Sequence, residues 1–266
     1  MSKETSAVIE HYRVDDLVDR ILRALAAAGH DIGRPTVEMF NLADQMHGGG
    51  LNATMVQAKL AGIAGGMRVL DAGCGIGGSS RYLAHTHGCR VDAIDLTPQF
   101  VAAAERLNAL CGLGDKIAVR AGSVTDLPYD DGSFDQVWSQ NVTMNVADKR
   151  AMFAEAFRVL KPGGRFSFSH LARGPAGEPF YPLPWAMDTS YSFLGTPEEI
   201  LQGLRDAGFA KVENRSEVSA PGTRPPNDIG AATVLGADMP QRQANAARSV
   251  KEGRLVPMLV LAERAG

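Results

Sequence analysis

The first residues able to do chemistry lie in a glycine-rich segment, residues 69–78, with the sequence Val-Leu-Asp-Ala-Gly-Cys-Gly-Ile-Gly-Gly. The segment stands where an apolar run gives way to a helical pattern, which predicts a strand, a tight turn and a helix start. Gly73, Gly75 and Gly78 allow the backbone to turn sharply and to approach a ligand at the helix N-terminus. This spacing fits a dinucleotide or another adenosine-containing cofactor.

A carboxylate two residues ahead of the first glycine separates these ligand classes. Asp71 holds that place, and it would repel the anionic pyrophosphate of a dinucleotide at short range. S-adenosylmethionine instead presents an ammonium and a sulfonium, while the loop amides can bind its carboxylate. Asp95, at the end of the next predicted strand, can accept from a ribose diol in either ligand. The charge of Asp71 therefore favours S-adenosylmethionine as the cofactor, with a nicotinamide-dependent oxidoreductase as the alternative.

Short apolar strands and helices alternate around this turn and must position it. The pattern predicts strands over residues 68–72, 90–95, 116–122, 134–139 and 164–170, and helices over 79–85, 97–110 and 149–160. Such alternation predicts an α/β fold whose parallel sheet is covered by helices on both faces. Further strands are predicted over 209–218 and 255–263, and helices over 196–208 and 228–253.

The residues before the sheet have a different character. An amphipathic pattern over 12–28 predicts a helix, residues 31–50 are rich in loop signals, and residues 51–61 predict a second helix. We therefore expect an N-terminal helical cap and lid over residues 1–66. A core over residues 67–266 follows, with an insertion at 172–195 that walls the acceptor pocket.

Composition limits the classes of partner. The chain has 266 residues, of which 45% are hydrophobic and 21% charged, and its net charge of −3 provides no positive field for nucleic acid or a membrane surface. No apolar run approaches the ~20 residues of a membrane helix. Three cysteines without zinc spacing predict no metal site and a reducing, cytoplasmic location. We expect a small-molecule acceptor as partner, with a homodimer left open.

Four segments together resemble the class I S-adenosylmethionine-dependent methyltransferases. They are residues 69–78, 94–97, 126–135 and 158–164, and they follow one another in the family's order. Residues 75–84 are similar to the small-molecule branch that contains γ-tocopherol methyltransferases and sarcosine/dimethylglycine N-methyltransferases. The resemblance implies a Rossmann-like, seven-stranded sheet that is mostly parallel, with an antiparallel last strand.

The resemblance also implies a set of cofactor-binding residues. Gly73, Gly75 and Gly77 would lie under the methionine moiety, and Asp95 would bind the ribose hydroxyls. Ser123 stands where many relatives have an aspartate near the adenine, and its hydroxyl can still bond the adenine edge. Besides these, the cofactor contacts that we expect come from Asp71, Leu96, Val124 and Gln140.

Candidates for catalysis come from two segments. His47, in a stretch that resembles the histidine-containing segments of related enzymes, would act as a base or position the acceptor, unless it only caps a loop. Its neighbour Gln45 would contact the acceptor. In the aromatic stretch 179–193, Tyr181 would take part in catalysis while Trp185 and Tyr191 face the substrate, unless these rings merely pack the insertion onto the sheet.

The loop after the fourth strand offers amide groups. Gln140 and Asn141 stand at the carboxyl end of the strand, where α/β sheets bind ligands, and Asn145 follows in the same loop. We assign Asn141 and Asn145 to acceptor binding, although Asn141 could simply satisfy the loop backbone. His170, at the end of the fifth strand, is expected to be a core histidine with satisfied hydrogen bonds.

These residues predict transfer of a methyl group to a small molecule. N-methylation of a glycine-type amine is the first expectation, and O- or C-methylation of an aromatic or isoprenoid molecule is the alternative. A carboxylate-bearing amine would need a cationic side chain in the pocket, for which the sequence offers Arg173 and Arg34. A cofactor-binding protein without methyl transfer is the rival from another class.

Overall fold

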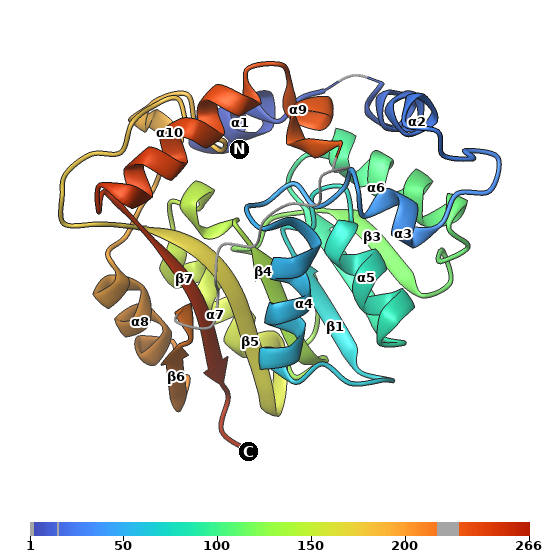
Figure 1. Cartoon of the computed structure of the whole chain (residues 1–266). Helices are drawn as coiled ribbons and strands as arrows, with labels where there is room; N and C mark the ends of the chain where they lie inside the picture. Colours follow the sequence, from blue (N-terminus) through green and yellow to red (C-terminus); the bar gives the residue numbers. More distant parts are fainter. Residues whose placement is uncertain (1–2, 15, 217–228) are drawn as a thin grey trace.

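The chain is built on one seven-stranded sheet with the strand order β3-β2-β1-β4-β5-β7-β6 (Figure 1). The computed structural model describes residues 3–14, 16–216 and 229–266. β7 runs antiparallel to both of its neighbours, and the remaining pairs are parallel, which confirms the expected Rossmann-like α/β fold. The strands are β1 (Arg68–Ala72), β2 (Arg90–Asp95), β3 (Ile117–Ala121), β4 (Phe134–Gln140), β5 (Leu160–Arg173), β6 (Lys211–Asn214) and β7 (Leu255–Glu263).

Helices cover both faces of the sheet because its central strands are apolar on both sides. Val69 and Leu70, adjacent on β1, are fully buried and point to opposite faces. Val69 packs in a cluster with α4 (Gly50–Ala61) and α5 (Gly78–Thr86), whereas Leu70 packs with α7 (Lys149–Val159) and α8 (Pro197–Asp206). α6 (Pro98–Leu110) lies against β2 and β3.

The first predicted elements need correction. The helix expected over 12–28 is the shorter α2 (Leu17–Ala27), and a helix that was not expected, α1 (Lys3–His11), precedes it. The loop expected over 31–50 contains the one-turn helix α3 (Val37–Phe40). α1 is too polar to be predicted from its own pattern. It folds there because Val8 is buried against the insertion.

Two predictions near the C-terminal half also change. β5 is longer than the expected 164–170 because its pairing with β7 continues to Arg173, opposite Leu255. The helical stretch expected over 228–253 is divided into α9 (Gly230–Leu235) and α10 (Met239–Lys251). Residues 217, 218 and 228, which fall in predicted elements, lie outside the described residues.

A helical cap lies above the carboxyl ends of the parallel strands (Figure 1). α1 and α2 come from the start of the chain and α9 and α10 from its end, and residues of α2 and α9 share one apolar cluster. The cap thus draws on more than the predicted residues 1–66. In the ranges that the structure describes, no helix has the length and apolar character needed to cross a membrane.

Candidate functional site

A cavity of about 1040 Å³ lies between the strand ends and the cap. It is bounded by the carboxyl ends of β1, β2, β4 and β5, and by side chains of α1, α10 and the insertion. This is the edge at which open α/β sheets bind ligands. Twelve of the predicted site residues line it, namely His47, Asp71, Gly73, Gly75, Asp95, Leu96, Ser123, Val124, Gln140, Asn141, Asn145 and Trp185.

The glycine turn has a shape that only glycine allows. Gly73 has φ +82°, and a Cβ atom there would lie 2.3 Å from a methyl carbon of Val142. Gly75 has φ +54°, and its Cβ would lie 2.8 Å from Cε of Met46. Gly77 is the N-cap of α5 and does not line the cavity, so its part is to form the turn.

Asp95 holds the glycine turn to the end of β2. Its Oδ2 accepts from the Gly75 amide at 2.8 Å, and its Oδ1 accepts from the Thr97 amide at 2.9 Å. Each carboxylate oxygen keeps further acceptor capacity. Because Asp95 lines the cavity, that capacity is available to hydroxyl groups of a ligand.

The adenine end that the sequence predicted lies next to Asp95. Leu96, Ser123 and Val124 line the same part of the cavity wall after β2 and β3. The Ser123 hydroxyl is paired with the Thr125 hydroxyl at 2.7 Å. A hydroxyl can accept a second hydrogen bond, so this pair still leaves Ser123 able to contact a base edge.

Asp71 is a buried carboxylate without an ion-pair partner among the described residues. It is 2% exposed, and its Oδ2 accepts from the Ser80 hydroxyl at 2.6 Å. Burial, together with the nearby Asp95 carboxylate, raises the pKa of Asp71 to about 7. A cationic ligand group in the cavity would relieve this cost, whereas a diphosphate would increase it.

Arg81 of α5 is a positioning residue that the sequence did not indicate. Its side chain is fully buried and donates to the Asp44 carboxylate, at 2.9 and 3.2 Å. It also donates to the Ile76 carbonyl at 2.7 Å and to Asn108 Oδ1 at 2.9 Å. One guanidinium thus joins the segment that carries His47, the glycine turn and α6.

His47 lines the cavity, but both of its ring nitrogens face oxygen atoms. Nδ1 lies 3.3 Å from the Gly48 carbonyl, and Nε2 lies 3.2 Å from the Thr54 hydroxyl. The Thr54 hydroxyl also donates to Gln45 Oε1 at 2.8 Å, so His47 is one member of a hydrogen-bonded network. Gln45 is buried in this network and does not line the cavity. Its role as an acceptor contact finds no support in its position.

Gln140 presents a buried donor at the cavity. Its Oε1 accepts from the Ser79 hydroxyl and lies 3.3 Å from the Thr54 hydroxyl, whereas its Nε2 is buried with no partner among the described residues. An unpaired amide N–H in a cavity costs free energy unless a ligand accepts from it. A ligand carboxylate would supply that acceptor.

The two asparagines of the following loop, Asn141 and Asn145, both line the cavity, and the side chain of Asn145 is held by hydrogen bonds within the protein. Asn145 lines the cavity, but its side chain accepts from the Tyr12 hydroxyl at 3.1 Å and donates to the carbonyls of Trp185 and Tyr191, at 3.0 and 3.2 Å. It therefore joins α1 to the insertion. Asn141, with φ +54°, also lines the cavity.

Only one of the three predicted aromatic residues reaches the cavity. Trp185 lines it, with its indole N–H donating to Ser192 Oγ at 3.0 Å. The Tyr191 hydroxyl accepts from the Met187 amide at 2.9 Å, and Tyr181 is half-buried in the same apolar cluster. Neither tyrosine lines the cavity. Their positions favour the alternative, that these rings pack the insertion, and lend no support to a catalytic Tyr181.

His170 was predicted to be a core histidine with satisfied hydrogen bonds, and the structure shows a buried histidine whose hydrogen bonds are not satisfied. It is 2% exposed and lines the cavity, and neither ring nitrogen has a partner among the described residues. Burial, together with the cation of Lys149, lowers the pKa of His170 to about 3. The apolar sequence around position 170 indicated burial but could not show which polar groups lie nearby.

Comparison with known proteins identifies the central segment. Residues 70–168 match the family described as "Methyltransferase domain". A sarcosine/dimethylglycine N-methyltransferase of Halorhodospira halochloris is 38% identical over 144 residues, which are 54% of this chain and 52% of that protein. A probable tocopherol O-methyltransferase of Oryza sativa subsp. japonica is 46% identical over 100 residues, which are 36% of this chain and 27% of that protein. The matched part of the chain thus covers about half or less of the length of these relatives.

Solved structures extend the likeness to the whole fold. The geranyl diphosphate C-methyltransferase of Streptomyces coelicolor A3(2) superposes with a TM-score of 0.66 at 22% identity, covering 99% of this chain and 98% of that one. The [4+2]-cyclase SpnF gives a TM-score of 0.68 at 22% identity, covering 98% and 97%. At this identity the likeness establishes the fold, cap included, and not the reaction.

Removing the buried guanidinium should destabilise the whole domain. We expect Arg81→Met to lower the free energy of unfolding by about 3–5 kcal/mol, because Asp44 is left buried without its cation. Urea denaturation followed by circular dichroism measures the change. Arg106→Met, which removes an exposed partner of Asp19 on the next helix, should cost less than about 1 kcal/mol. Equal losses in both variants would contradict a special role for Arg81.

Asp71 should make the ligand-free protein less stable as the pH rises. Its folded pKa of about 7 lies above its ordinary value of 3.8, so stability is fully present below 3.8 and falls as the pH rises through 7. Asp71→Asn should remove this fall in the free energy of unfolding. At ~1.4 kcal/mol per pKa unit, the shift from 3.8 to about 7 corresponds to at most about 4 kcal/mol. Urea midpoints at about pH 5 and about pH 8 test it. A variant that loses as much stability as the parent over this interval would refute it.

Proposed function

We propose that this chain carries a class I S-adenosylmethionine-dependent methyltransferase domain. From this premise, we propose that it methylates a small and largely apolar molecule at oxygen or carbon. The observation that carries the proposal is a single cavity with two chemically different halves. Polar and acidic groups gather at the glycine turn, and apolar side chains gather beneath the cap. The first half fits the methyl donor and the second fits the acceptor.

The residues of the first half fit the donor group by group. Asp71 offers a negative charge to its ammonium and sulfonium, and the unpaired Nε2 of Gln140 can donate to its carboxylate. Asp95 retains lone pairs for ribose hydroxyls. The space above Gly73 and Gly75, which a Cβ would obstruct, lets the backbone approach.

When bound, S-adenosylmethionine supplies an electrophilic methyl group on a positively charged sulfur, with a neutral thioether as leaving group. The chain then has to align the acceptor atom with that methyl group and keep water away. α1 and the insertion do so from above, because Tyr12 and Trp185 both line the cavity and are joined through Asn145. His47 lines the cavity and also contacts Gly48 and Thr54 of its own segment, so in this proposal it holds the loop in place.

The second half of the cavity favours an apolar acceptor. Its walls include Val8, Leu171, Trp185, Phe193, Val250 and Met258. Lys251 is the sole lysine or arginine among the described residues that line the cavity. Arg173 instead pairs with Glu199 at 3.6 Å, and neither Arg173 nor Arg34 lines it. A carboxylate-bearing amine was expected to need one of these two arginines in the pocket, and neither of them lines the cavity.

N-methylation of a glycine-type amine is the second candidate. The identity to the Halorhodospira sarcosine/dimethylglycine N-methyltransferase favours it, and Lys251 at the end of α10 could bind a carboxylate. A cofactor-binding protein without methyl transfer is the alternative from another class, and the tests below distinguish it from both candidates.

Cofactor choice can be tested without an acceptor. We expect S-adenosylhomocysteine to give a one-to-one heat of binding in calorimetry, and NAD⁺ to give none. Asp95→Ala should weaken S-adenosylhomocysteine at least about tenfold, because a charged hydrogen-bond acceptor is lost. Asp92→Asn, on the same strand but paired with Arg68 at its other end, should leave the affinity unchanged. Tight NAD⁺ binding alone would overturn the proposal.

Acceptor class can be tested with radiolabelled methyl donor and matched compounds. We expect a geranyl-substituted phenol to be methylated faster than sarcosine or geranylamine, because the acceptor half is apolar. Lys251→Met should leave that reaction unchanged and should reduce any activity on sarcosine. Sarcosine as the best substrate, with its turnover lost in Lys251→Met, would instead establish the second candidate.

A further inference from the structure

The acceptor half of the cavity contains one titratable group that the reaction so far leaves without a role. His170 is in β5, opposite Met258 of β7, and its neighbours along the wall are Leu171 and Pro257. It is almost completely buried, and both Nδ1 and Nε2 lack partners in the part of the chain that the structure describes. The Ser169 hydroxyl beside it is equally unpaired.

Two unpaired ring nitrogens in one buried histidine are unusual. A buried polar group ordinarily has a hydrogen-bond partner, and leaving one unmade costs about 1–3 kcal/mol. Met258 and Pro257 on the neighbouring strand offer no side-chain donor, and no described side chain hydrogen-bonds the His170 ring. The remaining source of a partner is a molecule in the cavity.

We propose that His170 is the proton acceptor for a hydroxyl-bearing substrate. This inference rests on the proposed methyl transfer and assigns its acceptor atom to oxygen. The acceptor hydroxyl donates a hydrogen bond to one imidazole nitrogen, which turns an oxygen lone pair toward the methyl donor. His170 is thereby both the group that orients the acceptor and the group that receives its proton.

The step balances without any further reagent. The acceptor oxygen forms a bond to the methyl carbon, and the carbon–sulfur bond breaks with its electron pair staying on sulfur. The hydroxyl proton passes to the imidazole nitrogen of His170 and from there to water. Nothing is oxidised or reduced, and the products are an ether and a neutral thioether.

The environment of His170 suits oxygen better than nitrogen. Burial and Lys149 lower its pKa to about 3, so the ring is neutral and does not repel a sulfonium. Such a weak base cannot take a proton from an alkylammonium product, whose pKa is near that of lysine, about 10. It can take one from an oxygen that becomes positively charged as it is methylated, because that oxygen is a far stronger acid.

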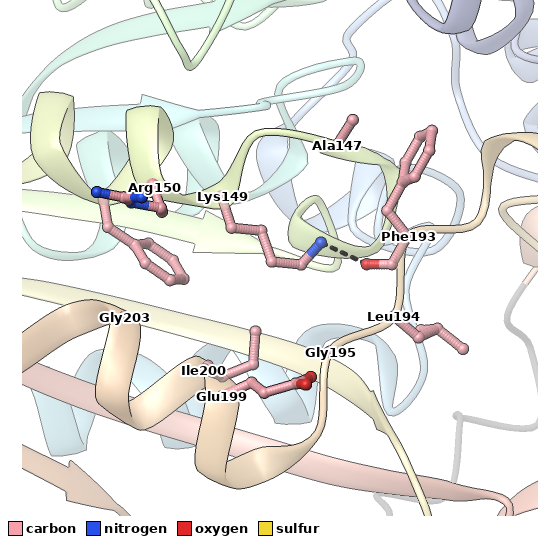
Figure 2. A pocket seen from close by; sticks show the side chains of 10 residues that line it. Ala147, Lys149, Arg150, Phe193, Leu194, Gly195, Glu199, Ile200 and Gly203 are labelled. Atoms are coloured by element: carbon pink, nitrogen blue, oxygen red, sulfur yellow. Dashed lines mark hydrogen bonds between the residues drawn. The ribbon is translucent and has the colours of Figure 1, made fainter. Parts of the chain in front are cut away.

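Lys149 is the cation that helps keep this histidine neutral. Its ammonium donates to the Val146 carbonyl at 2.8 Å. Figure 2 shows its second bond, to the Phe193 carbonyl. Both partner residues line the large cavity, whereas Lys149 itself lines a smaller pocket of about 330 Å³ between α7 and α8. The lysine therefore acts through His170 and through the cavity wall, as a positioning residue.

Replacing the imidazole should separate oxygen from nitrogen acceptors. With the geranyl-substituted phenol and geranylamine as probes, we expect His170→Asn to lower kcat on the phenol by about 10²–10⁴-fold and to change the amine rate less than about threefold. The affinity for S-adenosylhomocysteine should stay within about twofold, which shows that the variant is folded. His85→Asn, which removes an exposed partner of Glu38, is the matched control and should behave as the parent.

A second measurement tests the role of His170 without turnover, in case the protein methylates neither probe. In ¹⁵N-histidine spectra of the complex with S-adenosylhomocysteine, a saturating amount of the phenol should shift a His170 ring signal, which is assigned by its loss in His170→Asn. No shift, or an unchanged phenol rate in the variant, or equal losses on both acceptors, would overturn the role of His170. Failure of S-adenosylhomocysteine to bind at all would instead overturn the proposed function.

Discussion

The buried guanidinium of Arg81 is the constraint on which the site depends. A cation with no exposed surface needs hydrogen-bond acceptors around it, and here the Asp44 carboxylate, the Ile76 carbonyl and Asn108 accept four hydrogen bonds from Arg81. Those partners belong to the segment that carries His47, to the glycine turn and to α6. Because the same side chain binds that segment and the turn, it couples the position of one to the other. The geometry of Gly73 and Gly75 is therefore held from outside the turn as well as by Asp95.

The cap shows how the two ends of the chain make the acceptor half. α1 contacts the insertion through Val8, and the Tyr12 that follows it through Asn145, while α10 contributes Val250 and Lys251 to the opposite wall. The segment that matches the methyltransferase family, residues 70–168, contains most of the donor half and little of this cap. Relatives identified through that segment consequently carry information about the donor, and their different acceptors say little about the acceptor of this chain.

The sequence was sufficient for the sheet and for the donor half, because both depend on local signals. The bounds of β1, β2 and β7 follow directly from apolar runs, and the glycine turn from its spacing. The acceptor half was less predictable. Residue type placed Tyr181 in the site and His170 in the core, yet Tyr181 packs against the apolar cluster of the insertion and the strand end brings His170 to the cavity. Which way a side chain faces in an irregular segment depends on partners distant in sequence, and no local pattern encodes them.

The distribution of charge in the cavity explains why two such different halves can share one space. Two carboxylates, the buried Asp71 and the partly buried Asp95, make the donor half a place where positive charge is stabilised. A neutral imidazole and apolar side chains make the acceptor half a place where positive charge is costly. A methyl cation equivalent crossing from the first half to the second would leave its charge on the acceptor. In the proposed O-methylation the charge therefore leaves as a proton at the moment of transfer, and the proposal assigns its receipt to His170.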